Sequence, residues 1–424
     1  MRVEDLVYFC APARLIVGTG ARAQLPALLK RLNYRRGLLV TDTFFTAHTP
    51  WVKELVDGAR AEGIDLLVYD GGMADPTTTL CDAATAVVRE RLAGALVDHV
   101  IALGGGSTID LAKALCLTLP SGQPVGSFVG MIDAATPILP LVALPTTAGT
   151  GSEATPGAIL VDPANATKVA VMDNRLRPGI ALIDPEFTYT CPPRVTADAG
   201  IDALTHAIES YLTLDSVRFD RGGQPDPGYS GRNALTMLFA RESIALCARY
   251  LMRSYLDGSD TEARIGMSYA SVYAALSYGS AGLNAVHGIA YAVAGMTHQS
   301  HGSTNAVMLP YVLDALRDER GEELLTIARM FGVDDADVNT AVARLPAVVR
   351  DLVGALGIPT DIRRFGVART ELDRLTGDAL GVARLATAFP VADVPARYAQ
   401  VVANAWQGHL SFDDLAADDT RRVA

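Results

Sequence analysis

Short apolar runs alternate with amphipathic segments through roughly the first 190 residues of the chain. The segments repeat their apolar positions at helical spacing, which predicts helices over 23–32, 51–63 and 79–94. The runs are rich in β-branched residues and predict strands over 14–18, 37–42, 65–71, 96–106, 141–147 and 179–187. Apolar strands separated by helices indicate a parallel sheet covered on both faces. We therefore expect an α/β domain over residues 1–190.

The pattern changes after residue 190. Long stretches rich in Ala and Leu carry apolar positions at helical spacing and predict helices over 199–212, 233–252, 263–280 and 323–332. At 424 residues the chain exceeds the size of one typical core. We expect a second, all-α domain over residues 191–424, interrupted by a loop at 215–232 that is rich in Gly, Pro and charge.

Composition narrows the classes of partner. A net charge of −11 argues against binding to nucleic acid, which relies on clustered Lys and Arg. The five cysteines are scattered without a CxxC pair, which is typical of a reduced cytoplasmic protein. No apolar run approaches the roughly 20 residues of a membrane span, and the N-terminus lacks the pattern of a signal peptide. We expect a soluble cytoplasmic protein with a small-molecule partner and no membrane partner.

Two loops of small residues suggest a phosphate site. GGGSTID (104–110) joins a predicted strand to a predicted helix, where exposed N–H groups and the helix dipole favour phosphate. Its spacing is not GxGxxG, so a tight turn without a ligand remains an alternative. PTTAGTGSEAT (145–155) follows the next strand and would reach the same edge of the sheet. Asp42, at another strand end, suits ribose hydroxyls and favours NAD over NADP, although it equally fits a helix N-cap.

A carboxylate and three histidines form a second group of interest. Asp202 and His206 are four residues apart in a predicted helix and share one face. His287 and His301 lie on either side of a predicted turn, in a segment that also contains His298. One carboxylate with three imidazoles suits Fe²⁺ or Zn²⁺. The alternatives are a helix ion pair between Asp202 and His206 and hydrogen-bonded core histidines.

Together these motifs resemble the iron-containing (group III) alcohol dehydrogenases. The resemblance extends from about residue 10 to about residue 400 and is carried by GGGSTIDLAK, ALPTTAGTGSEAT, IALIDPE, GIDALTHAIESY and HG(x)12HG, in that order. It implies a dehydroquinate synthase-like architecture, with a dinucleotide-binding α/β domain, an all-α domain and an active site in the cleft between them. It also implies NAD(H), one divalent metal (Fe²⁺ first, Zn²⁺ as the alternative), and a homodimer or larger homo-oligomer.

The resemblance assigns roles residue by residue. The metal ligands would be Asp202, His206, His287 and His301. The cofactor would contact Gly104, Gly105, Gly106, Ser107, Thr146, Thr147, Thr150 and Lys168. Asp110 would either approach the nicotinamide, as a catalytic and cofactor-binding residue, or cap a helix. The reaction implied is hydride transfer between the nicotinamide and the alkoxide or carbonyl of a small substrate.

Three positions depart from the family pattern. Tyr291 stands where many relatives have a histidine, as in HGxxH, and is either a catalytic hydroxyl relay or a packing residue. Asp75 replaces the usual Asn. The loop at 215–232 is longer than usual and brings Arg218, Arg221 and Arg232, which suit an anionic substrate unless they are simply solvated.

Two other activities are compatible with the same motifs. One is a hydroxyacid–oxoacid transhydrogenase, or a 4-hydroxybutyrate-type dehydrogenase, with tightly bound NAD. The more remote one is a dehydroquinate synthase-like lyase.

Overall fold

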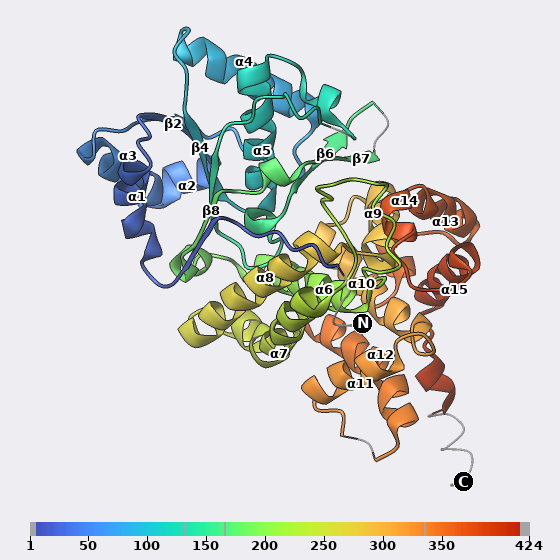
Figure 1. Ribbon diagram of the computed structural model, residues 1–424. Coiled ribbons are helices and arrows are strands. Elements are labelled where there is room, and N and C mark those ends of the chain that lie inside the picture. Colours follow the sequence, from blue (N-terminus) through green and yellow to red (C-terminus); the bar gives the residue numbers. More distant parts are fainter. Residues whose placement is uncertain (1–5, 131, 165–166, 335, 416–424) are drawn as a thin grey trace. The chain divides into compact units, whose positions relative to one another are not determined.

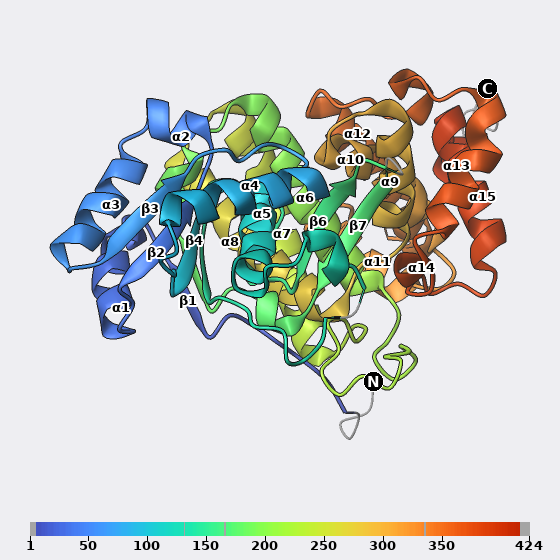
Figure 2. The same cartoon turned by 90° about the horizontal axis from the view of Figure 1, so that it is seen from above.

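The computed structural model describes residues 6–130, 132–164, 167–334 and 336–415. These residues form two compact units, shown in two views in Figures 1 and 2. The α/β unit consists of the described residues within 10–191 together with 225–228. The helical unit consists of the remaining described residues, including 6–9 near the N-terminus. No helix in the described residues is long and apolar enough to cross a membrane.

A six-stranded parallel sheet forms the centre of the α/β unit. Its order is β1-β8-β5-β4-β2-β3, and each predicted strand is present. The strands are β1 (Arg14–Val17), β2 (Arg36–Val40), β3 (Asp65–Tyr69), β4 (His99–Gly104), β5 (Leu141–Pro145) and β8 (Ile180–Ile183). Every residue of β4 and β5 is buried, as expected for central parallel strands. The predicted parallel α/β fold is confirmed.

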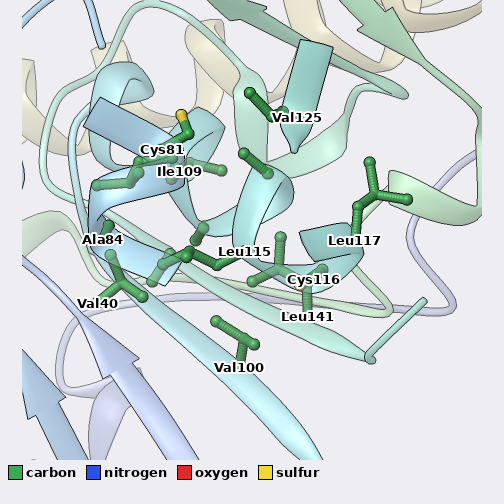
Figure 3. Close-up of a cluster of buried hydrophobic side chains, with 14 of the residues drawn as sticks. Val40, Cys81, Ala84, Val100, Ile109, Leu115, Cys116, Leu117, Val125 and Leu141 are labelled. Atoms are coloured by element: carbon green, nitrogen blue, oxygen red, sulfur yellow. The ribbon is translucent and has the colours of Figure 1, made fainter. Parts of the chain in front are cut away.

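Helices cover both faces of this sheet. One face packs against α1 (Leu25–Arg31), α2 (Thr43–His48) and α3 (Trp51–Ala61), and the other against α4 (Thr78–Leu92) and α5 (Gly106–Ser121). Figure 3 shows the second core, where Cys81 of α4 and Ile109 of α5 lie in one cluster with Val100 of β4. Val100 and its neighbour Ile101 enter opposite cores, because successive strand residues point to opposite faces.

A hairpin in the α/β unit was not among the predicted strands. It consists of β6 (Gly157–Asp162) and β7 (Thr167–Met172), paired antiparallel. Only two residues of β6 and one of β7 are fully buried, so neither strand is enclosed as the central strands are. Short 3-10 turns complete the unit: η1 (Ala21–Gln24), η2 (Val125–Phe128), η3 (Ser152–Ala154), η4 (Asn174–Leu176) and η5 (Pro185–Thr188).

The second unit is helical throughout its regular structure, as predicted. Its α-helices are α6 (Pro193–Leu212), α7 (Ala234–Leu256), α8 (Thr261–Ala281), α9 (Ala285–Thr297), α10 (His301–Ala315), α11 (Gly321–Met330), α12 (Val338–Ala355), α13 (Leu372–Leu380), α14 (Ala383–Ala386) and α15 (Val394–Gln407). Two 3-10 turns, η6 (Ile362–Phe365) and η7 (Arg369–Glu371), lie between them. Helices α6, α7 and α8 pack together, and α10 packs against α6, α9 and α12.

Helix α6 is largely enclosed by this packing. Every residue from Gly200 to Leu212 is buried, including two carboxylates and a histidine. Burying a charge is costly unless it is paired and hydrogen-bonded. The polar residues of α6 therefore need partners from the helices around it.

Helix α10 can approach α6 closely because Gly302 has no side chain. A Cβ atom on Gly302 would clash with the backbone carbonyl of Asp198 on α6. The next residue, Ser303, donates a hydrogen bond from Oγ to Asp198 Oδ1 at 2.6 Å. This contact fixes the start of α10, where His301 lies, against the helix that carries Asp202.

We expect Gly302→Ala to lower the melting temperature, because overpacking a buried contact costs about 1–3 kcal/mol. Gly295→Ala on α9 is the matched control, since a Cβ atom there would meet nothing within 4 Å. That control should be neutral or stabilise by up to about 1 kcal/mol through helix propensity. Thermal unfolding followed by circular dichroism makes the comparison. Equal melting temperatures for the two variants would show that the contact at Gly302 tolerates a methyl group.

Candidate metal centre and dinucleotide site

Four side chains of the helical unit converge on one point. Asp202 and His206 come from α6, His287 from α9 and His301 from α10, and one ligand atom of each lies within 4.8 Å of all the others. Asp202 Oδ1 lies 3.8 Å from Nε2 of His206, 3.8 Å from Nε2 of His287 and 3.6 Å from Nε2 of His301. Ligand atoms that each bind one ion at about 2.0–2.2 Å are separated by comparable distances. The group could hold a divalent transition metal.

Helix geometry explains this convergence. Asp202 and His206 are one turn apart on α6 and project from the same face. His287 and His301 are 14 positions apart, separated by most of α9 and a turn, and His301 is the first residue of α10. His298 ends α9 in the left-handed conformation, with φ 55°, and its N–H bonds to Ala294 O at 2.8 Å. The third histidine of this segment is therefore a helix cap outside the cluster.

The charge state of Asp202 suits a cation. Burial raises the pKa of its carboxyl, but the nearby imidazoles of His206, His301 and His287 and the amide of Asn305 have the larger combined effect. The pKa of Asp202 consequently lies below its usual range, and the side chain is a carboxylate at neutral pH.

Glu209 supports this cluster and was not singled out from the sequence. Its Oε1 accepts backbone N–H groups of Asn284, Val286 and His287 at 3.1, 2.8 and 3.3 Å. Its Oε2 makes a short hydrogen bond to Nδ1 of His287. A proton held between Oε2 and Nδ1 leaves Nε2 of His287 facing the other three donors. Burial raises the pKa of Glu209, and the backbone N–H groups limit the rise.

Tyrosine rings flank the imidazoles. Tyr278 of α8 stacks on His206, with ring centroids 4.2 Å apart and an interplanar angle of 13°. Tyr291, the residue that departs from HGxxH, lies 5.7 Å from the ring of His301 and 6.1 Å from that of His287. Tyr291 is thus beside the cluster, whereas Tyr278 is a neighbour that the sequence analysis did not identify.

The loops predicted to bind phosphate lie together in the α/β unit. Gly104 ends β4, Gly105 precedes α5, and Gly106 and Ser107 are its first residues. The following loop packs against them, since a Cβ atom on Gly106 would meet the Thr150 side chain. Thr147 lies 3.5 Å from the corresponding position on Gly105, and Thr146 N donates to Gly104 O at 3.1 Å. The helix N-terminus and these small residues form a surface that could bind a pyrophosphate.

Asp42 follows β2, the strand next to β4. Its Oδ1 caps α2 by accepting the N–H groups of Phe44 and Phe45 at 2.9 and 3.4 Å. Asp42 is therefore a helix N-cap through one of its two carboxylate oxygens. Neither of these hydrogen bonds uses Oδ2, so that oxygen is available to another partner.

Lys168 of β7 pairs with Asp75. Its Nζ donates to Asp75 Oδ1 at 3.0 Å, and the N–H of Asp75 donates to Ser107 Oγ at 3.2 Å. Asp75 has φ 49°, a left-handed conformation that Asp and Asn tolerate better than most residues. A carboxylate and an ammonium group thus stand next to the glycine loop.

A buried lysine, Lys113, joins the glycine-loop helix to the hairpin. Its Nζ donates to Ser152 Oγ, Thr155 O and Gly157 O at 2.9, 3.0 and 2.6 Å. Burial lowers the pKa of Lys113 to about 8, against the attraction of Asp110.

Asp110, one turn before Lys113 on α5, completes this network. It accepts Ser152 Oγ at 2.5 Å and the N–H of Ile159 at 2.9 Å. Both carboxylate oxygens therefore bond within the unit. The sequence signal for Lys113 was a single lysine in the apolar stretch DLAKALCL.

Comparison with known families covers both halves of the chain. Residues 12–185 match the model described as iron-containing alcohol dehydrogenase, and residues 228–395 match the C-terminal model of the same family. Both halves thus have the sequence pattern of one class of metal-dependent oxidoreductases. The chain belongs to the iron-containing alcohol dehydrogenase family, whose members are NAD-dependent and bind iron.

Individual relatives agree with this assignment. The NAD-dependent methanol dehydrogenase of Bacillus methanolicus is 31% identical over 88% of this chain and 92% of its own length. Long-chain-alcohol dehydrogenase 1 of Geobacillus thermodenitrificans (strain NG80-2) is 33% identical over 94% of this chain and 96% of its own. The solved structure of a 1,3-propanediol oxidoreductase has a TM-score of 0.85 at 27% identity, covering 95% of this chain and 100% of that one.

We expect Glu209→Gln to weaken metal binding about 10- to 100-fold, because the amide no longer holds the proton at Nδ1 of His287. Competition with a chelator, using Zn²⁺ or Co²⁺, measures the change. Glu153→Gln is the matched control, since Glu153 is also a buried glutamate but lies in the α/β unit. Unchanged affinity in Glu209→Gln would mean that Glu209 only supports the start of α9.

Proposed function

We propose that this protein interconverts small alcohols with aldehydes or ketones, using NAD(H) and a divalent metal held by Asp202, His206, His287 and His301. The observation that carries the proposal is the convergence of these four donors within 4.8 Å. Fe²⁺ is the first candidate because of the family, and Zn²⁺ suits the same donor set.

The protein's own groups have distinct tasks in this proposal. A bound divalent cation supplies Lewis acidity, which polarises a carbonyl and eases deprotonation of an alcohol. Asp202 contributes the negative charge of the site, and Glu209 keeps Nε2 of His287 turned towards the other donors. Tyr291, next to His287 and His301, is our candidate for carrying a proton through its hydroxyl.

The cofactor contacts follow the glycine loop. The N–H groups of Gly104, Gly105, Gly106 and Ser107 would bind the pyrophosphate, and Thr146, Thr147 and Thr150 would line the same surface. Asp42 would accept a ribose hydroxyl through Oδ2, which favours NAD over NADP. For Asp110 the bonds to Ser152 and Ile159 support a role in holding the loops in place.

The contacts of the loop at 215–232 favour an uncharged substrate in this proposal. Arg232 is buried and pairs with Asp215 at 2.8 Å and Glu323 at 2.7 Å. The guanidinium of Arg221 lies 4.7 Å from the ring centroid of Tyr8, and Arg218 is exposed. Because Arg232 has carboxylate partners inside the protein, we propose that Arg232 does not bind an anionic substrate.

Freshly metallated protein should oxidise NADH faster with butyraldehyde than with succinic semialdehyde, compared by kcat/KM. The two aldehydes have the same number of carbon atoms and differ by one carboxylate. His206→Ala, which removes a proposed ligand, is the control and should lose both activities. Preference for the charged aldehyde would restore an anion-binding role for the loop. Turnover between hydroxy and oxo acids without release of NAD would identify a transhydrogenase instead.

Asp75→Asn should tighten NADH binding about fivefold, because a surface charge a few ångströms from a phosphate contributes about 1 kcal/mol. Fluorescence titration of metal-free protein measures this affinity independently of the metal. Asp65→Asn is the control, since Asp65 lies at the amino end of β3, whereas Asp75 follows the carboxyl end of that strand. Lys168→Met should weaken binding in the wild-type background.

Lys168→Met in the Asp75→Asn background distinguishes between two roles of Lys168. If Lys168 only neutralises Asp75, its loss there should have little effect. If Lys168 touches phosphate, its loss should still weaken NADH binding in that background. Unchanged affinity in Asp75→Asn would place the phosphates away from Asp75.

A further inference from the structure

Asn305 lies inside the four-donor cluster. It is one turn after His301 on α10 and is completely buried. Its Nδ2 lies 2.8 Å from Asp202 Oδ1, 3.0 Å from Nε2 of His287 and 3.2 Å from Nε2 of His301. One amide group thus meets three of the four candidate ligand atoms.

The orientation of the Asn305 amide follows from these neighbours. Its Oδ1 is buried and accepts no hydrogen bond from the described residues. An unsatisfied buried acceptor is unfavourable, so the orientation must be maintained by the contacts of Nδ2. The reverse orientation would set Oδ1 against the carboxylate of Asp202, acceptor against acceptor. Asp202 therefore selects the orientation that points N–H groups into the cluster.

A metal ion and this amide compete for the same lone pairs. An imidazole nitrogen binds a metal through the single lone pair with which it accepts a hydrogen bond. His287 offers that lone pair at Nε2 in the tautomer that carries its proton at Nδ1, the nitrogen facing Glu209 Oε2. Coordination by His287 and His301 is therefore incompatible with the contacts of their Nε2 atoms to Asn305.

We propose that Asn305 acts as a placeholder for the metal ion, by which we mean that its amide bonds to the metal ligands when no metal is bound. In the metal-free protein the two N–H bonds of its amide are shared among the ligand atoms of Asp202, His287 and His301, and metal binding breaks its contacts to Nε2 of His287 and His301. The placeholder stabilises the metal-free state relative to the loaded one. It thereby lowers metal affinity and keeps metal binding reversible. The inference depends on the ligand set proposed above.

Asn305→Ala tests this inference through metal affinity and stability. We expect the dissociation constant for Zn²⁺, measured by chelator competition, to fall about tenfold. The melting temperature should fall in EDTA more than in saturating Zn²⁺, because ligand affinity and stability are linked. Asn305→Asp preserves the shape, removes the donor and adds a negative charge. It should tighten Zn²⁺ binding further and lower the melting temperature in EDTA further.

Asn233→Ala is the matched control. Asn233 is also a completely buried asparagine of the helical unit, but it caps α7 and donates to Tyr8 O at 3.2 Å. Its replacement should lower the melting temperature equally with and without Zn²⁺ and leave affinity unchanged.

Weaker Zn²⁺ binding in Asn305→Ala, or equal losses of stability in both states, would overturn the placeholder role. Such results would assign Asn305 to orienting Asp202 in the loaded site. A wild-type protein that binds no Zn²⁺, or a His206→Ala variant that binds it as tightly as wild type, would instead refute the proposed ligand set.

Discussion

The burial of two carboxyl groups on α6 is the constraint around which the helical unit is organised. Asp202 and Glu209 are both buried, and each needs partners that α6 itself does not provide. Glu209 finds them in the backbone and side chain of the start of α9, and Asp202 finds Asn305 of α10. The same contacts bring His287 and His301 to His206. The hydrogen bonds that satisfy the buried carboxyl groups therefore also assemble the four-donor cluster.

The elements with a strong repeating pattern could be predicted from the sequence. The continuous apolar runs became the six strands of the sheet, and the helix-period segments after residue 190 became α6, α7, α8 and α11. The β6–β7 hairpin was missed: its apolar runs at 158–161 and 169–172 are short, and its strands are only partly buried. The four convergent donors were found through residue type and family resemblance. Their supporting residues were not.

Glu209, Asn305 and Tyr278 show why supporting residues are harder to find. Each belongs to a helix that was predicted or follows a predicted turn, and none has an unusual residue type. Their importance depends on which face of α6 meets α8, α9 and α10, and sequence spacing alone does not specify that packing. Lys113 is a partial exception, since a lysine in an apolar helix already indicates a buried partner.

The tie between α5 and the hairpin has a mechanical consequence. Lys113 and Asp110 connect the helix that begins at the glycine loop to β6, and β6 is paired along its whole length with β7, which carries Lys168. The hairpin therefore cannot shift independently of the helix N-terminus. If the glycine loop and Lys168 contact the dinucleotide as proposed, this chain of hydrogen bonds ties together the two surfaces that would bind it.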